Sequence, residues 1–208
     1  SLLPIINVVY FFRKKFKGVK FILEVRDVWP LSLIELGGKS KNNIFVKFLG
    51  WVEKLGYSKA DYIVSTLEHL NVHISKILGH SEFNFSWITN GYELNNNQAS
   101  LNSDIDNKIP RDKFLIGYAG TLGIANAMEY IITAFNNIEN DNLALCILGS
   151  GNEKENLIRM SKNQNVYFFD KIPKNQVISF LSRMDVLYLS YRNLGIYKYG
   201  ISANKLFD

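Results

Sequence analysis

Short apolar stretches rich in Val, Ile and Phe alternate along the chain with segments whose apolar residues recur near the 3.6-residue period of a helix. This βαβ rhythm predicts an α/β fold, with mostly parallel sheets and helices on their faces. The apolar runs predict strands at residues 20–26, 61–65, 83–88, 113–118, 143–148, 165–169 and 186–190. The periodic segments predict helices at residues 4–16, 43–59, 67–78, 126–138, 153–162 and 174–184.

Residues 95–112 interrupt this rhythm. The segment is rich in Asn, Ser and Asp, contains a Pro and has no apolar period, so it predicts a linker between two α/β domains. The expected division is residues 1–94, a linker at 95–112, and residues 113–208. Two domains of this size fit a chain of 208 residues that is 47% hydrophobic.

Cysteine and histidine offer little chemistry. Cys146 is the single cysteine and lies in the apolar run 143–148, so it is expected to be a packed thiol, and a disulfide framework is excluded. His69 and His73 share a helix face, but no third residue completes a metal-site spacing. We therefore expect no metal site and interpret the histidines as solvated surface residues.

The formal charge of +5 indicates anionic partners, which could be nucleic acid, a membrane surface or a phosphate-bearing substrate. The basic residues are dispersed and form no nucleic-acid-binding signature, so we expect no nucleic acid partner. No apolar run approaches the roughly 18 residues of a membrane span, and no signal peptide is visible. A cytoplasmic protein is the expectation.

Polar and glycine-rich stretches follow four of the predicted strands, at residues 24–30, 88–91, 118–123 and 148–153. In open parallel sheets, ligands bind where strand carboxyl ends meet helix amino ends, because backbone N–H groups and helix dipoles there favour anions. Each glycine pair alone is also compatible with an ordinary turn. Their order along the chain is the more specific signal.

The ordered motifs are Val-Arg-Asp-Val-Trp-Pro at 25–30, Thr-Asn-Gly at 89–91, Tyr-Ala-Gly-Thr-Leu-Gly at 118–123, Leu-Gly-Ser-Gly-Asn-Glu at 148–153 and Gly-Ile-Ser-Ala-Asn-Lys-Leu-Phe-Asp at 200–208. This series resembles the family-4 glycosyltransferases of the GT-B fold, especially the bacterial branch that builds capsule and O-antigen polysaccharide. The resemblance covers essentially the whole chain.

The resemblance implies two Rossmann-like domains facing a cleft, both incomplete in this chain. Residues 1–94 would be the C-terminal part of the acceptor-side domain, and residues 113–208 the N-terminal part of the nucleotide-sugar domain. The family's first strands would precede Ser1, and its closing helices would follow Asp208. The chain in isolation is therefore expected to be inactive.

For the donor site, the resemblance implies binding by Gly120, Thr121, Leu122, Gly123, Gly149, Gly151, Lys205 and Asp208. Many members clamp the diphosphate with an Arg and a Lys, but Thr121 and Asn126 occupy those positions here. Backbone N–H groups of residues 120–123 at a helix start would then act together with Lys205. Lys205 is equally interpretable as a solvated lysine.

The family's Glu-x7-Glu pattern would fall at Gly200 and Asp208, so its first carboxylate is absent and its second is shortened. Asp208 could still hold a ribose hydroxyl, or be an ordinary first-turn aspartate stabilised by the helix dipole.

For the first domain, the resemblance implies catalytic or acceptor-binding roles for Arg26 and Asp27, which could instead form a structural salt bridge. Trp29, Asn90 and Gly91 would line the acceptor cleft, and Trp29 is also interpretable as part of a packed turn.

Residues 10–17 mix aromatic and basic side chains, a composition found in helices that lie in a membrane interface. A helix packed on its own sheet, with a basic solvated face, gives the same pattern. Because related enzymes use lipid-linked acceptors, peripheral contact with the inner face of the cell membrane remains open.

The function implied by the resemblance is transfer of a sugar from a nucleotide diphosphate, expected to be UDP, to a polysaccharide or lipid-linked saccharide with retention at the anomeric carbon. No flanking carboxylate pair of the glycosidase type is found, and no metal or other cofactor is expected. Two alternatives stay open: a sugar-nucleotide epimerase of the same fold, and a degenerate module that binds nucleotide-sugar without catalysis.

Overall fold

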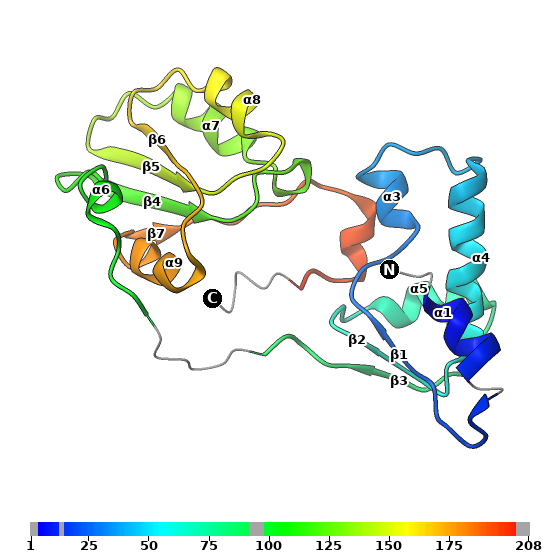
Figure 1. The fold of residues 1–208 in the computed structure, drawn as a ribbon. Coiled ribbons are helices and arrows are strands. Elements are labelled where there is room, and N and C mark those ends of the chain that lie inside the picture. The colour runs from blue at the N-terminus through cyan, green and yellow to red at the C-terminus, as the bar shows by residue number, and fades with distance from the viewer. Residues whose placement is uncertain (1–3, 13–14, 92–97, 203–208) are drawn as a thin grey trace. The chain divides into compact units, whose positions relative to one another are not determined.

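The computed structural model describes residues 4–12, 15–91 and 98–202. Contacts divide the chain into two compact units. The first unit holds the residues up to Gly91 together with residues 193–202, and the second holds residues 98–192. Each unit is built on its own parallel sheet with helices packed against it, which confirms the α/β class (Figure 1).

The sheet of the first unit has the order β1-β2-β3, with β1 at Ile22–Val25, β2 at Tyr62–Ser65 and β3 at Phe85–Trp87. All pairs are parallel, and Val25 lies opposite Ser65 in the register. Burial alternates along β1, so that Leu23 and Val25 point into the core whereas Ile22 and Glu24 are exposed. The period of two places one face of this sheet against its helices.

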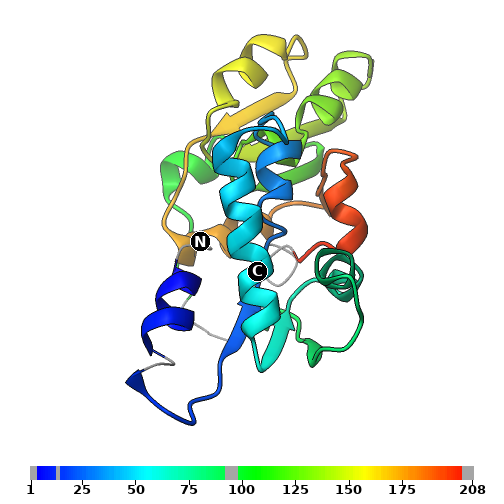
Figure 2. The ribbon, with the colours of Figure 1, turned by 90° about the vertical axis from the view of Figure 1, so that its right-hand side faces the viewer.

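The helices of this unit are α1 (Pro4–Asn7), the π-helix η1 (Val8–Phe12), α3 (Leu31–Glu35), α4 (Ile44–Lys59) and α5 (Leu70–Leu78). The side chain of Asn43 caps α4 by accepting from the amide of Phe45 at 2.9 Å. α1 packs on α4 at Gly56, where a Cβ atom would lie 2.9 Å from Ile5. Figure 2 shows α4 in cyan.

A buried polar group lies in the core of the first unit. Glu53 on α4 is 2% exposed, and its Oε1 atom is 2.7 Å from Nε2 of His73 on α5, which is 5% exposed. The hydroxyl of Tyr57 donates to the same oxygen at 3.1 Å. Burial, and then the neighbouring Glu53 carboxylate, raise the pKa of Tyr57 well above its usual value. The interpretation of His73 as a surface residue is therefore wrong, because the Glu53 partner permits its burial.

Residues 193–202 pack in the first unit, although the predicted division grouped them with residues 113–208. They include the 3-10 helix η3 (Gly195–Tyr199), whose Tyr199 ring lies 5.0 Å from that of His73. The Tyr199 carbonyl accepts from the amide of His69 at 2.9 Å. Gly200 has φ +116 and a Cβ there would lie 2.9 Å from the amide of Glu68, so this position excludes a carboxylate side chain.

The sheet of the second unit has the order β6-β5-β4-β7 and is parallel throughout. Its strands are β4 (Phe114–Ala119), β5 (Leu143–Leu148), β6 (Val166–Phe169) and β7 (Val186–Leu187). β5 is buried from Ala144 to Leu148 because helices cover both of its faces. Cys146 lies in this strand, fully buried, and burial raises the pKa of its thiol to about 12.

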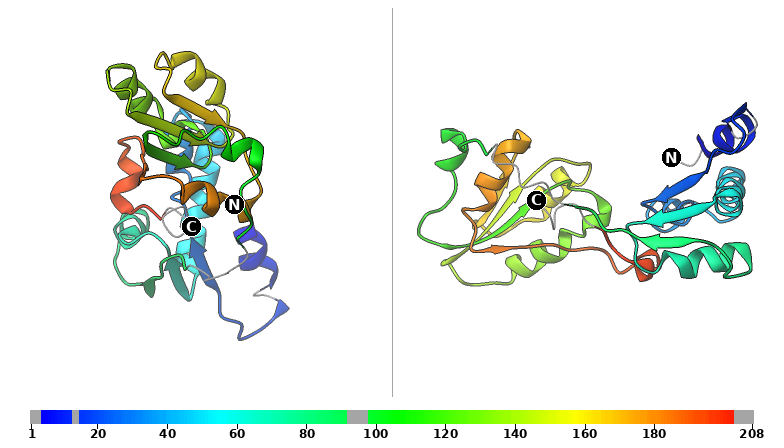
Figure 3. Two further views of the ribbon diagram at one scale, coloured as in Figure 1. Left: turned by 90° about the vertical axis from the view of Figure 1, so that its left-hand side faces the viewer. Right: turned by 90° about the horizontal axis from the view of Figure 1, so that it is seen from below.

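Alternate residues of β5 contact the two helical layers. Leu145 and Ile147 pack with α7 (Glu129–Asn136) and α8 (Lys154–Met160). Ala144, Cys146 and Leu148 pack with Phe180 of α9 (Lys174–Leu181). Figure 3, right, shows α7 and α9 on opposite sides of this sheet.

The described part of the expected linker is structured and packs on the second unit. It contains the short helix α6 (Ser103–Asp106), capped by the side chain of Asn102 at 2.8 Å from the Asp104 amide. Ile109 is buried in the same cluster as Phe180. The amide of Ala99 donates to Asn175, and its carbonyl accepts from Ser179. The polar composition of this segment therefore did not indicate that specific hydrogen bonds hold it on the second unit.

All seven predicted strands are present, but helix boundaries differ. The predicted helix 126–138 begins at Glu129, because residues 124–126 form the separate 3-10 helix η2 (Ile124–Asn126) and Ala127 follows with φ 48. The predicted helix at 4–16 is α1 followed by η1 in its described part. α3, α6, η2 and η3 were not predicted, since three to five residues carry too little periodicity to detect.

We predict that Glu53→Ala lowers the free energy of unfolding by about 3–5 kcal/mol, because it leaves His73 and the Tyr57 hydroxyl buried without their shared partner. Urea denaturation measures this loss. Glu82→Ala, which removes an exposed carboxylate from the same unit, should change stability by no more than about 0.5 kcal/mol. A loss below about 1 kcal/mol for Glu53→Ala would contradict the role assigned to the buried pair.

Candidate functional site

Two loops cross at the carboxyl edge of the second sheet. Residues 120–123 follow β4 and residues 149–153 follow β5. The amide of Leu122 donates to the carbonyl of Ser150 at 2.9 Å, and the amide of Glu153 donates to the carbonyl of Leu122 at 3.0 Å. Leu122 is fully buried, so it anchors one loop against the other.

Glycine is required at this crossing. Gly149 has φ +150, and a Cβ atom there would overlap the carbonyl oxygen of Gly120. A Cβ on Gly151 would overlap the carbonyl oxygen of Leu122. These glycines, which the sequence predicts as donor-binding residues, are needed for close backbone approach whether or not a ligand is bound.

The crossing also decides which backbone amides can meet an anion. The Gly120 amide donates to Leu148 and the Leu122 amide donates to Ser150. The amides of Thr121 and Gly123 make no hydrogen bond to the described residues. Because η2 begins at Ile124 and α7 at Glu129, the loop does not open directly into a long helix. Two amides, rather than four, are then available on this loop for a phosphate.

Residues after β7 are attached to the same loop. The Ser190 hydroxyl donates to the Asn126 carbonyl at 2.5 Å, and the Arg192 amide donates to the Ala125 carbonyl at 3.2 Å. The Arg192 guanidinium is 2.7 Å from Oε1 of Glu129, in the first turn of α7. Arg192 was not among the predicted site residues, because it lies outside the five motifs. The predicted strand that ends just before it says nothing about a ligand.

Tyr118 closes the loop from the end of β4. Its hydroxyl donates to the Thr121 carbonyl at 2.7 Å, and the Asn126 side chain donates to the same carbonyl at 2.9 Å. Burial, with a smaller contribution from Tyr191, raises the pKa of Tyr118 well above its usual value. The Tyr118 hydroxyl therefore stays protonated at neutral pH and keeps this bond.

In the first unit, the structure brings Arg26 and Asn90 together. A guanidinium nitrogen of Arg26 donates to Oδ1 of Asn90 at 2.8 Å, and Nδ2 of Asn90 donates to the Ser202 hydroxyl at 2.7 Å. The acidic group nearest to Arg26 in the recorded ion pairs is Glu24, at 3.7 Å, and not Asp27. Asp27 is exposed.

A cavity of about 310 Å³ lies beside these residues at the carboxyl end of β1. Its lining combines apolar side chains of the core with Arg26, Asp27, Trp29, Glu53 and Tyr57. Trp29 precedes a cis peptide bond to Pro30 and is half-buried. Glu53 and Tyr57 come from α4, far from any motif, and their place in the lining follows from packing alone.

Other predicted residues take no part in these clusters. Gly91 is exposed, with nothing within 4 Å of a Cβ placed there. Lys205 and Asp208 lie outside the described residues. Within the described ranges, no group of three or more His, Cys, Asp or Glu side chains is arranged to hold a metal ion.

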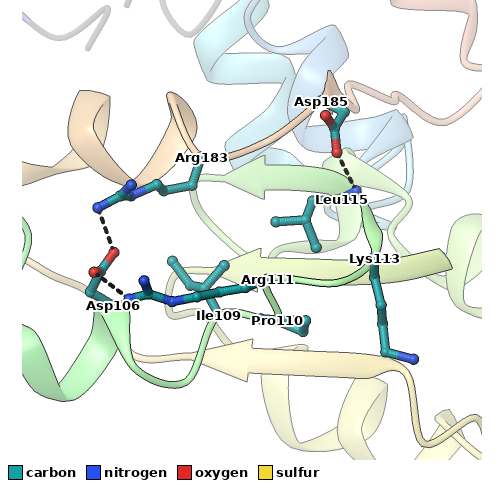
Figure 4. A pocket seen from close by; sticks show the side chains of 8 residues that line it. All are labelled: Asp106, Ile109, Pro110, Arg111, Lys113, Leu115, Arg183 and Asp185. Atoms are coloured by element: carbon teal, nitrogen blue, oxygen red, sulfur yellow. Dashed lines mark hydrogen bonds and ion pairs between the residues drawn. The ribbon is translucent and has the colours of Figure 1, made fainter. Parts of the chain in front are cut away.

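A further cavity, of about 250 Å³, lies at the opposite end of β4 (Figure 4). Asp106 accepts there from Arg111 at 3.1 Å and pairs with Arg183 at 3.0 Å, while Asp185 accepts from the Leu115 amide at 2.7 Å. These charges satisfy one another. Because ligands of parallel sheets bind at the carboxyl ends of strands, we interpret this cluster as structural.

Residues 101–201 match the family described as glycosyl transferases group 1. This part of the chain is similar to the group 1 glycosyltransferases. Over 165 residues it is 25% identical to WcaI of Escherichia coli, which is named as a colanic acid biosynthesis glycosyl transferase. The alignment covers 74% of this chain and 40% of WcaI.

Solved glycosyltransferase structures show the same GT-B fold. HepE of Anabaena, solved in complex with UDP and glucose, superposes with a TM-score of 0.63 at 12% identity, over 92% of this chain and 51% of HepE. WaaG, a glycosyltransferase involved in lipopolysaccharide biosynthesis, gives a TM-score of 0.61 at 12% identity, over 87% of this chain and 55% of WaaG. The chain thus spans about half the length of these proteins.

We predict that Gly149→Ala lowers the free energy of unfolding of the protein by about 2–4 kcal/mol, because the new methyl group meets the Gly120 carbonyl and φ is unfavourable. Gly123→Ala is the matched control: its nearest neighbours lie 3.8 Å away, and it should change stability by about 0.5 kcal/mol or less. Thermal or urea unfolding compares the two. Equal stability of both variants would contradict the crossing as described.

Proposed function

We propose that the protein transfers a sugar from a UDP-sugar to a hydroxyl of a polysaccharide or lipid-linked saccharide, with retention at the anomeric carbon. The observation that carries this proposal is the loop crossing at the carboxyl edge of the second sheet, in a chain whose residues 101–201 match a glycosyltransferase family. The unpaired amides of Thr121 and Gly123 lie where an anionic donor is expected in such a sheet. The UDP complex of HepE supports a nucleotide-sugar donor.

The reaction breaks the bond between the anomeric carbon and the β-phosphate oxygen and forms a bond to the acceptor oxygen on the same face of the sugar. The acceptor proton passes to the departing phosphate. Protein N–H groups and cations stabilise the charge on that phosphate, so this route needs no metal. Lys205 remains a proposed donor ligand and Asp208 a proposed ribose ligand, as the resemblance implies.

For the acceptor, we propose the cavity at the carboxyl end of β1. Arg26 and Asp27 are candidates to bind acceptor hydroxyl or phosphate groups, and Trp29 forms part of the wall. Asn90, which follows β3, accepts a hydrogen bond from the Arg26 guanidinium. Glu53 also lines this cavity, but its buried carboxylate is engaged by His73 and Tyr57, so we assign it the role of supporting the wall.

We predict that the natural full-length protein consumes a UDP-sugar only when a saccharide acceptor is present, and that EDTA leaves the rate unchanged. Incubation with a panel of UDP-sugars, followed by chromatography and NMR of the product, measures transfer and anomeric configuration. Interconversion of UDP-sugars without acceptor would identify the epimerase alternative. Tight binding without turnover would identify a non-catalytic module, and loss of transfer in EDTA would contradict the metal-free route.

We also propose a cytoplasmic protein that contacts the inner face of the cell membrane through η1. Tyr10, Phe11 and Phe12 are more than half exposed, and Lys15 lies 5.6 Å from the ring of the exposed Phe16. Exposed aromatic side chains beside lysines suit an anionic lipid surface. No helix in the described part of the chain is both long and apolar enough to cross a bilayer.

We predict that a triple Ser substitution of Tyr10, Phe11 and Phe12 reduces binding to phosphatidylglycerol vesicles about tenfold or more, because it removes the apolar contact area. Vesicle co-sedimentation of the full-length protein measures this. A triple Ser substitution of Ile44, Phe45 and Phe48, exposed on α4, is the matched control and should retain binding. Loss of binding in the control alone would place the contact on α4 instead.

A further inference from the structure

Arg192 is held beside the loop that follows β4. Its amide donates to the Ala125 carbonyl, and two residues earlier the Ser190 hydroxyl donates to the Asn126 carbonyl. Asn126 in turn donates through its side chain to the Thr121 carbonyl at 2.9 Å. A chain of hydrogen bonds therefore links the segment of Arg192 to Thr121, whose amide makes no hydrogen bond to the described residues.

The Arg192 guanidinium has hydrogen-bonding capacity that the described residues do not use. One terminal nitrogen pairs with Glu129 at 2.7 Å. The Nε atom is buried and has no hydrogen-bond partner, and it is the one such buried side-chain atom recorded in the described residues. Leaving a buried donor of a charged group unpaired costs free energy, so such groups need a physical explanation. A ligand that carries hydrogen-bond acceptors and binds the guanidinium would explain the unused donor.

The loop itself provides no positive charge. Thr121 is neutral and exposed, and the Asn126 side chain is used to hold Thr121. Lys154, which opens α8, is paired with Asp170 at 2.6 Å and also bonds the Phe169 carbonyl. Within the described second unit, Arg192 is therefore the cation attached to the loop that carries the available amides.

We propose that Arg192 binds the diphosphate of the nucleotide-sugar donor, acting with the amides of Thr121 and Gly123. The inference rests on the proposed function and names a residue for the charge that the loop lacks. A guanidinium presents several N–H groups in a planar fork and suits phosphate oxygens. The Arg192 side chain is 41% exposed, so a ligand can approach it from solvent.

Glu129 sets the strength of this contact. In the free protein it partly neutralises Arg192, and it also places a negative charge near the proposed phosphate position. Replacing Glu129 by Gln keeps the size and a hydrogen-bond acceptor but removes the charge. The affinity for UDP should then rise about two- to fivefold, because the partly exposed Glu129 carboxylate no longer competes for the guanidinium or repels the phosphates of the ligand.

The test uses the full-length protein and compares UDP with uridine by calorimetry and ligand-observed NMR. Arg192→Ala should weaken UDP binding about tenfold to a hundredfold and leave uridine binding unchanged, because only the diphosphate contact is lost. Arg192→Lys keeps a charge without the fork and should lie between. Arg159→Ala removes an equal charge from the exposed face of α8 and should leave both affinities within about twofold.

The signs of the two affinity changes, for Arg192→Ala and for Glu129→Gln, show whether Arg192 binds the ligand or only supports α7. If Arg192 only holds α7 through Glu129, then Arg192→Ala and Glu129→Gln weaken UDP binding together, and uridine binding falls as well. Opposite effects of the two variants support the proposal. A folded Arg192→Ala protein with unchanged UDP affinity, or a loss confined to Lys205→Ala, overturns it while the proposed function stands. A wild-type protein that binds no nucleotide-diphosphate sugar overturns the proposed function itself.

Discussion

The second unit depends on one contact between backbones, at Leu122. Its amide and its carbonyl are both engaged by the loop after β5, and its side chain is fully buried. Two segments can approach this closely only where side chains are absent, which fixes glycine at positions 149 and 151. The requirement for glycine is steric and does not depend on a ligand. It sets the backbone path of both loops at the carboxyl edge of the second sheet.

The same contact limits what the loop can do for an anion. Engaging the Gly120 and Leu122 amides in the crossing stabilises the loop but removes them from a ligand, and the amides of Thr121 and Gly123 remain. Two neutral donors are a weak partner for a diphosphate with several charges. A backbone amide gives a phosphate a hydrogen bond without an opposite charge, whereas a guanidinium gives both, so a well-placed cation outweighs a further amide. For this reason we propose that Arg192 supplies the positive charge beside these two amides.

Strand positions and fold class could be predicted from sequence, because buried parallel strands are continuous apolar runs, as residues 143–148 illustrate. The burial of His73 could not, since its partner Glu53 lies 20 residues away on another helix. Likewise, the polar segment 98–112 gave no sign of the bonds that Ala99 makes with Asn175 and Ser179. Local pattern locates the two glycine-containing loops, whereas the positions of Arg192 and Glu53 follow from long-range packing that no motif encodes.

The two candidate sites differ in the chemical groups that form them. In the first unit, charged and polar side chains form part of the cavity lining, and the hydrogen bond between Glu53 and His73 supports it from within the core. In the second unit, backbone geometry forms the carboxyl edge of the sheet, and Arg192 is the cation that we propose to supply charge there. An acceptor with many hydroxyl groups needs directional polar side chains. A diphosphate is the same in every donor, so a rigid backbone cradle with one cation suits it. The contrast explains why the glycine motifs are recognisable in the sequence while the polar lining of the acceptor side is not.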